Sequence, residues 1–163
     1  MNFDNYFDEF TKELNSIEDF RLQVLFLHLH LEYWINKIIE KSFVKPEEIF
    51  KNRDLRTFYN KLCIIDSLSL LHPKAIEKIK IVNEIRNHYS HNIVGKEEFP
   101  KKIIDNIQNL MKDSPVKEEI NKYGVNLVHQ FVIQCTGMII SLEEIYETTS
   151  KITDNKIFSK TNQ

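Results

Sequence analysis

An arginine, an asparagine and a histidine near the middle of the chain have the types and the spacing for chemistry on a phosphate. Arg86 is followed directly by Asn87, and His91 comes five positions after the arginine. Arginine carries a fixed planar cation that suits phosphate oxygens, and histidine changes its charge near neutral pH. An amide beside them can donate or accept a hydrogen bond. Arg86, Asn87 and His91 are therefore our candidate catalytic residues.

These three residues lie at the end of an expected helix over residues 73–92. Each residue of an α-helix advances about 100°, so Asn87 and His91 share one face. Three further polar residues project from that face, Lys80, Glu84 and His88. Arg86 and His91 diverge by about 140° on a straight helix. They could meet only through the long arginine side chain, a distorted last turn or a second copy of the helix, which a twofold dimer would supply.

The sequence Arg-Asn-x-x-x-His at the end of a helix resembles the signature of the HEPN superfamily. These are small all-α proteins, many of which are RNA-cleaving toxins or defence ribonucleases. Residues 22–92, somewhat under half of the chain, look like the mannitol-repressor-like branch, in which an apolar helix similar to residues 30–37 precedes the motif helix. Members of that branch are thought to act as regulators. The resemblance therefore implies either a ribonuclease or a non-catalytic regulatory dimer that binds RNA or protein.

The resemblance also implies roles for individual residues. It implies a dimer around the motif that cleaves RNA without a metal, through attack of the ribose 2′-hydroxyl on the adjacent phosphate. His91 would act as general base or acid, Arg86 would neutralise charge growing on the phosphate, and Asn87 would position it. Many active toxins carry a tyrosine two residues after the histidine, where this chain has Ile93. We expect three neighbours to contact the RNA: Lys80, His88 and Tyr89.

Two polar residues of the preceding expected helix, His28 and Glu32, are four apart and share a face. They could orient His91 or the RNA, or they could pair with each other inside a core or a dimer seam. The second interpretation is favoured because buried polar groups need partners. His88 and His91 could share a metal with Glu84, but no further ligands accompany them, so neither a metal nor another cofactor is expected.

The composition narrows the class of protein. The chain has 163 residues, of which 42% are hydrophobic and 28% charged, as is typical of one globular domain. The net charge is −2, whereas a protein that coats RNA would be more basic. A nuclease that holds a few nucleotides needs only local positive charge. No glycine-rich phosphate loop, zinc signature or helix-turn-helix pattern is present, so direct reading of DNA is not expected.

Apolar periodicity predicts an all-α, single-domain bundle of about five long helices plus short ones. The expected helices cover residues 4–14, 17–43, 46–50, 54–68, 73–92, 97–112, a short stretch after Ser114, and 126–148. Ser16 and Asp19 match a Ser-x-x-acid start signal for the second helix. The bundle should span residues 1–150, and residues 151–163 should form a frayed tail.

Further residues and the cellular setting complete these expectations. Cys63 and Cys135 lie in apolar patterns and should be buried free thiols, and His129 should be a core residue. No signal peptide is expected at the start, and residues 22–43 are too polar for a bilayer span. We expect a cytoplasmic homodimer without membrane contact, acting on RNA as a toxin or defence effector. A toxin would also need an antitoxin or another regulatory protein partner.

Overall fold

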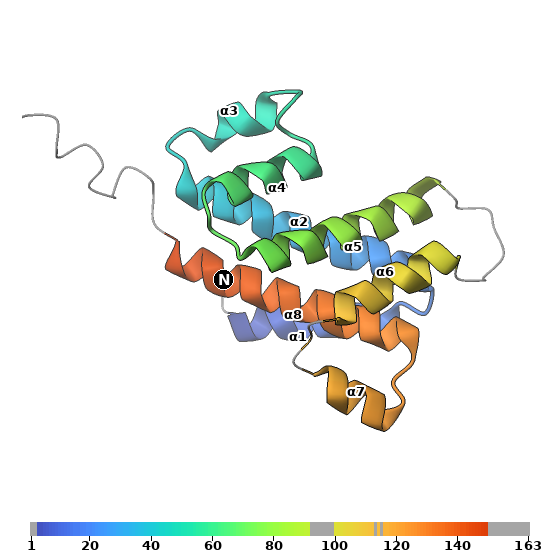
Figure 1. Cartoon of the computed structure of the whole chain (residues 1–163). Coiled ribbons are helices and arrows are strands. Elements are labelled where there is room, and N and C mark those ends of the chain that lie inside the picture. The colour runs from blue at the N-terminus through green and yellow to red at the C-terminus, as the bar shows by residue number, and fades with distance from the viewer. Residues whose placement is uncertain (1–2, 92–99, 113, 115, 150–163) are drawn as a thin grey trace, which may run out of the picture. The chain divides into compact units, whose positions relative to one another are not determined.

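The computed structural model describes residues 3–91, 100–112, 114 and 116–149 (Figure 1). The regular structure of these residues consists of eight helices and no strand. The helices are α1 (Phe3–Ser16), α2 (Phe20–Ser42), α3 (Pro46–Lys51), α4 (Phe58–Ser67), α5 (Pro73–His91), α6 (Lys101–Met111), α7 (Lys117–Tyr123) and α8 (Leu127–Thr148). The all-α prediction is confirmed. The expected tail over residues 151–163 lies outside the described residues.

The chain divides into two compact units. The first contains Met1–Leu29 and Ile81–Thr136, and the second contains His30–Lys80 and Gly137–Gln163. The divisions fall inside α2, α5 and α8, so each of these helices contributes residues to both units. The expectation of one domain over residues 1–150 stays a prediction.

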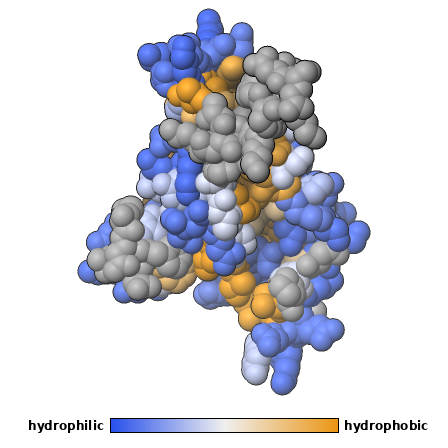
Figure 2. All heavy atoms as spheres, turned by 90° about the vertical axis from the view of Figure 1, so that its left-hand side faces the viewer, coloured by the Kyte–Doolittle hydropathy of each residue, from blue (hydrophilic) through white to orange (hydrophobic). Residues whose placement is uncertain are grey.

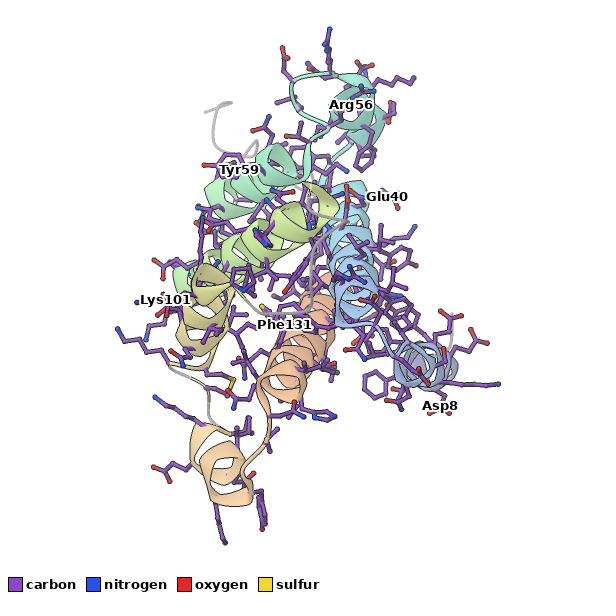
Figure 3. The ribbon with its side chains drawn as sticks, turned by 90° about the vertical axis from the view of Figure 1, so that its right-hand side faces the viewer. Asp8, Glu40, Arg56, Tyr59, Lys101 and Phe131 are labelled. Atoms are coloured by element: carbon purple, nitrogen blue, oxygen red, sulfur yellow. The ribbon has the colours of Figure 1, made fainter. Side chains whose placement is uncertain are left out.

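Apolar side chains at helical spacing form the core of the first unit. Phe10 of α1 stacks on Phe26 of α2 with ring centroids 5.6 Å apart. Phe20, at the start of α2, meets Phe131 of α8 edge to face at 5.4 Å. Phe131 is completely buried, and in Figure 3 it lies among the helices while Lys101 of α6 points outward. Burial of large aromatic rings is the main stabilising contribution available to a unit of this size.

The second unit has a core of aliphatic residues from α2, α4, α5 and α8. Its fully buried members include Ile35, Ile38, Ile39, Leu62 and Ile65. Trp34 of α2 packs against Tyr146 of α8 with ring centroids 5.6 Å apart. Lys41 Nζ donates to the carbonyls of Tyr146 at 2.6 Å and of Glu147 at 3.0 Å. The ammonium therefore binds carbonyls that the last turn of a helix leaves without helical donors.

The expected start of the second helix is wrong. Ser16 ends α1, where its hydroxyl donates to the carbonyl of Glu13. The cap of α2 is Asp19, whose Oδ1 accepts the backbone N–H of Arg21 at 2.8 Å. Both residues are good capping types, and a carboxylate gains additionally from the positive end of the helix dipole. The Ser-x-x-acid pattern therefore predicted the cap of α2 at Ser16, three residues before the cap that the structure shows at Asp19.

The expected helix start at Asp54 is also wrong. Asn52 Oδ1 accepts the backbone N–H of Asp54 at 2.8 Å, which holds this stretch in a turn. The helix α4 begins only at Phe58, after Thr57, whose hydroxyl accepts the N–H of Asn60 at 3.3 Å. A threonine cap ranks close to an aspartate cap, so sequence alone did not separate them.

Three smaller expectations can be compared with the structure. Asn126 caps α8 through its Oδ1, which accepts the N–H of His129 at 2.9 Å. His129 is exposed, so its expected place in the core is wrong. Its position in the first turn of α8 directs the ring away from the core. Cys135 is buried as expected, and burial raises the pKa of its thiol well above the usual value, whereas Cys63 is only half-buried; both cysteines are free.

On the face drawn in Figure 2, hydrophilic residues cover most of the described surface and apolar residues appear in smaller groups. No helix in the described part of the chain is long and apolar enough to cross a membrane.

Candidate functional site

The motif lies on the last turns of α5, at the rim of the helix face that is buried. Ile79, Val82 and Ile85 of α5 are buried, each with an exposed fraction of at most 1%. Their spacing of three residues keeps them on one side of the helix. The next four residues, Arg86, Asn87, His88 and Tyr89, are all partly exposed. Burial of the isoleucine and valine row therefore fixes the orientation of α5 and leaves the motif accessible.

Arg86 and Asn87 form a hydrogen bond at the centre of this site. Arg86 Nη1 donates to Asn87 Oδ1 at 3.0 Å. No ion pair joins Arg86 to a carboxylate among the described residues. Glu84, two residues before Arg86, instead places its Oε2 3.9 Å from Lys102 Nζ of α6. Among the described residues, the partly buried guanidinium thus has an amide acceptor and no carboxylate partner.

The third motif residue, His91, is the last residue of α5. Its side chain lies outside the described residues. The backbone is α-helical from Pro73 through His91. The last turn of α5 is thus regular helix up to its final residue.

His28 and Glu32 both have partners on other helices. His28, which is 2% exposed, places Nε2 3.1 Å from Asn83 Oδ1 of α5. Glu32 Oε1 accepts from Lys61 Nζ of α4 at 2.8 Å, and Lys61 is 6% exposed. Sequence reasoning missed both partners. Asn83 is 55 positions from His28 along the chain, so no local sequence pattern indicates this pairing.

The start of α2 lies against the motif. Tyr89 contacts Phe20 edge to face, with ring centroids 5.8 Å apart. Burial raises the pKa of the Tyr89 hydroxyl, while the charge of Arg21 lowers it and the charge of Asp19 raises it. Arg21 donates from Nε to Asp19 Oδ1 at 3.0 Å, and the bonds to this guanidinium lower the pKa of Asp19 from 3.8 to about 2. An ion pair that the sequence did not single out therefore borders Tyr89.

Two contacts define the direction of α2 relative to α5: Phe20 with Tyr89, and His28 with Asn83. Advancing along α2 from Phe20 to His28 corresponds to moving back along α5 from Tyr89 to Asn83. The first part of α2 and the last part of α5 are therefore antiparallel neighbours. This pairing places the start of α2 at the motif end of α5.

The remaining candidates for contact with RNA fall in different units. His88 meets the ring of Tyr89 edge to face at 5.3 Å, beside Arg86 and Asn87 in the first unit. Lys80 belongs to the second unit, where its Nζ lies 6.0 Å from the ring centroid of Tyr59. The described residues contain no cluster of histidine, cysteine, aspartate or glutamate that could hold a metal ion.

The structure joins Arg86 to Asn87 by a hydrogen bond and His88 to Tyr89 by a ring contact, and the charge of Arg21 acts on Tyr89. Consecutive residues point to different sides of a helix, so Arg86 and Asn87, which the hydrogen bond joins, form the set that could act on one ligand. Such a set can bind an anion and stabilise charge that develops on it. No model of a protein family matches the chain, and no curated protein and no solved structure matches it either. The likeness to HEPN proteins rests on the motif residues and their place at the end of α5.

Proposed function

We propose that this chain is a HEPN-type helical protein that acts as a metal-independent endoribonuclease. The observation that carries the proposal is the state of Arg86, a partly buried guanidinium with an amide partner and no carboxylate among the described residues. Partly buried charges are normally paired. A phosphate that enters the site would supply the missing negative charge, and arginine binds phosphate oxygens through two parallel N–H groups.

Asn87 contributes a directed donor in this proposal. Its Oδ1 accepts from Arg86, so the other end of the amide, Nδ2, is left to donate to a second acceptor. A phosphate oxygen held by Arg86 provides that acceptor. The arginine and the asparagine would then orient one phosphate from two sides, and Arg86 would stabilise the additional charge of the transition state.

The chemical step is a displacement at phosphorus. The ribose 2′-oxygen forms a bond to the adjacent phosphorus as the bond from phosphorus to the 5′-oxygen breaks, which leaves a 2′,3′-cyclic phosphate and a 5′-hydroxyl. One group must accept the proton of the 2′-hydroxyl and another must protonate the departing 5′-oxygen. Histidine suits both roles because its pKa is close to the working pH. Two copies of His91 would fill them.

A twofold homodimer supplies the second copy. Within one straight helix Arg86 and His91 point about 140° apart, whereas a twofold axis near the end of α5 would bring both residues of both chains to one cleft. Leu22 and Leu29 of α2 are seven residues apart on one face and are 55% and 62% exposed. We assign this leucine face to the contact with the second copy, since α2 begins beside the motif.

The biological setting follows from the activity. A ribonuclease of this kind would act on cytoplasmic RNA as a toxin or defence effector, with a neutralising protein as partner. The other function is a regulatory dimer, similar to the mannitol-repressor-like branch, that keeps the motif to bind RNA or protein without cleaving. The two functions differ in whether RNA is cut.

The deciding experiment incubates the purified protein with structured and single-stranded RNAs in the presence of EDTA. We expect the parent to produce 2′,3′-cyclic phosphate ends and His91→Ala to produce none. The matched control is His129→Ala, which removes an exposed histidine from α8 and should cleave as the parent does. Cleavage that persists in His91→Ala, or that EDTA abolishes, would contradict the mechanism. An intact fold without cleavage by any of the proteins would favour the regulatory dimer.

A further inference from the structure

The segment between α3 and α4 combines positive charge, exposure and a neighbouring aromatic ring. We define the basic loop as residues 51–57, Lys-Asn-Arg-Asp-Leu-Arg-Thr. All seven residues are exposed. The loop contains three cations and one carboxylate, in a chain whose net charge is −2. Arginine is scarce in this sequence, and two of its four arginines, Arg53 and Arg56, lie here.

Backbone hydrogen bonds hold the basic loop in a defined turn. The carbonyl of Asn52 accepts from the N–H of Leu55 at 3.2 Å and from the N–H of Arg56 at 3.0 Å. These bonds from i+3 and i+4 form one helical turn, in which residues three apart lie on the same side. Arg53 and Arg56 are three apart. The turn therefore starts both arginine side chains from neighbouring positions of one ordered backbone turn.

Side chains anchor this turn at both ends. Asn52 accepts the N–H of Asp54, and Asn60 of α4 donates from Nδ2 to the carbonyl of Asp54. No ion pair joins Arg53 or Arg56 to a carboxylate in the described part of the chain. The two arginines thus stand on an ordered backbone, and ligand binding would cost less ordering of the chain than in a free loop.

Tyr59 adds an aromatic surface next to the basic loop. It lies in the first turn of α4, three residues after Arg56, and is 53% exposed. The ammonium of Lys80 lies 6.0 Å from its ring centroid. In Figure 3, Arg56 and Tyr59 point outward from the loop and from α4. The described surface here offers two guanidinium groups, an ammonium and an exposed ring within a single unit.

We propose that the basic loop, Tyr59 and Lys80 bind single-stranded RNA, with a base stacked on Tyr59 and the flanking phosphates held by Arg53, Arg56 and Lys80. Single-stranded nucleic acid is bound in this way by positive grooves with aromatic platforms. An acidic protein could bind the three cations, but it has no bases to stack on Tyr59. The inference rests on the proposed ribonuclease function for the choice of RNA, and it assigns the surface that retains the substrate.

The test measures the Kd of a fluorescein-labelled single-stranded RNA by fluorescence anisotropy. His91→Ala is the parent for this assay, with EDTA present, so that the probe stays intact. In Arg53→Gln/Arg56→Gln we expect weaker binding, and the slope of log Kd against log salt should fall by about 1.4 because single-stranded contacts contribute about 0.7 each. The matched control, Lys117→Gln/Lys122→Gln, removes two exposed cations from α7 and should leave the slope unchanged.

A second pair of variants tests stacking. Tyr59→Leu should raise the Kd at least about fivefold, while Tyr59→Phe should bind as the parent does. The matched control is Tyr123→Leu, because Tyr123 is 74% exposed and carries Lys122 at 5.4 Å from its ring centroid. Tyr123 and Lys122 combine a ring and an ammonium as Tyr59 and Lys80 do, but without Arg53 and Arg56. Its Kd should not change.

The outcomes separate this inference from the proposed function. An unchanged Kd in both Arg53→Gln/Arg56→Gln and Tyr59→Leu, with an unchanged salt slope in the arginine variant, would overturn the RNA surface, even if the wild-type chain cleaves RNA. Loss of binding in these variants would establish the surface, even if no protein cleaves. Loss of binding in the arginine variant with an unchanged Kd for Tyr59→Leu would indicate a purely electrostatic surface and would overturn the stacking site.

Discussion

His28 of α2 and Asn83 of α5 share a hydrogen bond of 3.1 Å, in which the histidine is 2% exposed. Because the acceptor is the amide oxygen, Nε2 of the imidazole must carry the proton. The bond lies one helical turn before Asn87, on the helix that presents the motif. It joins two antiparallel helices that also meet at the motif itself, through the rings of Phe20 and Tyr89. We infer that this buried bond sets the register of the motif helix.

The first prediction concerns stability. His28→Ala removes a buried ring and leaves Asn83 Oδ1 without its partner, so it should lower the free energy of unfolding by about 1–3 kcal/mol. Urea denaturation followed by circular dichroism measures this change. His129→Ala, which removes an exposed ring, should change the free energy of unfolding by no more than about 0.5 kcal/mol. An equally small change in His28→Ala would show that the bond does not stabilise the fold.

The second prediction separates a functional arginine from a structural one. Arg86→Gln keeps a polar side chain and removes the charge, so cleavage should slow by about 10²–10³-fold, as for loss of one stabilising donor. The free energy of unfolding should stay the same or rise, since charged site residues are poorly compensated by the fold. Single-turnover cleavage and urea denaturation give the two values. A clear loss of stability in Arg86→Gln would assign the residue to the core instead.

The sequence was sufficient to predict the motif helix and its buried side. The row of apolar residues at Ile79, Val82 and Ile85 predicted which face would be covered, and Pro73 predicted where the helix begins. Such information is local, because helix starts and amphipathic spacing depend on residues within a few turns. The placement of Arg86 at the rim of the covered face follows from the same spacing.

The partners of the buried polar groups could not be predicted from the sequence. His28 was expected to pair within its own helix, yet Asn83 is 55 positions away along the chain. Its position depends on how two helices align, which no local pattern contains. Helix starts failed for a different reason: Ser16 and Asp19 are both good caps, and only the backbone shows which of them accepts the N–H of Arg21.

The third prediction uses the pKa of Asp19. Its folded pKa of about 2 lies below the usual 3.8, so the carboxylate stabilises the fold above pH 3.8, and this contribution disappears as the pH falls towards 2. Asp19→Asn keeps a capping oxygen and loses the charge. At pH 6 the free energy of unfolding of the wild-type protein should exceed that of Asp19→Asn. The difference should be less than about 1 kcal/mol, because the ion pair of Asp19 with Arg21 is partly exposed to solvent. Denaturant unfolding at several pH values, with Glu18→Gln as control, measures the difference. If the difference in free energy of unfolding between wild type and Asp19→Asn were as large at pH 2 as at pH 6, the ion pair would be excluded as its cause.

The fourth prediction tests the leucine face as the dimer contact. Leu29→Glu places a charge on a side that the proposed dimer buries, so the chain should become monomeric. Light scattering after size-exclusion chromatography gives the mass in solution. Ile133→Glu is the matched control, because Ile133 is also exposed, at 39%, but lies on α8; its mass should equal that of wild type. A parent that is already monomeric, or a dimer that survives Leu29→Glu, would contradict this assignment.

The fifth prediction concerns the shared cleft. Arg86→Gln and His91→Ala each remove one functional group, so Arg86→Gln alone should cleave about 10²–10³-fold more slowly and His91→Ala alone should not cleave. Co-expression of the two variants produces mixed dimers in which one chain still supplies Arg86 and the other still supplies His91. If both chains contribute to one cleft, that cleft holds one arginine and one histidine in the mixed dimers. Cleavage should then return only in part, because one of the two proton transfers lacks its histidine, and it is measured on dimers purified through two different tags. Sites contained within single chains would give no recovery, because every site would still lack one group. Partial recovery would also explain why Arg86 and His91 can work together although they point about 140° apart on one helix.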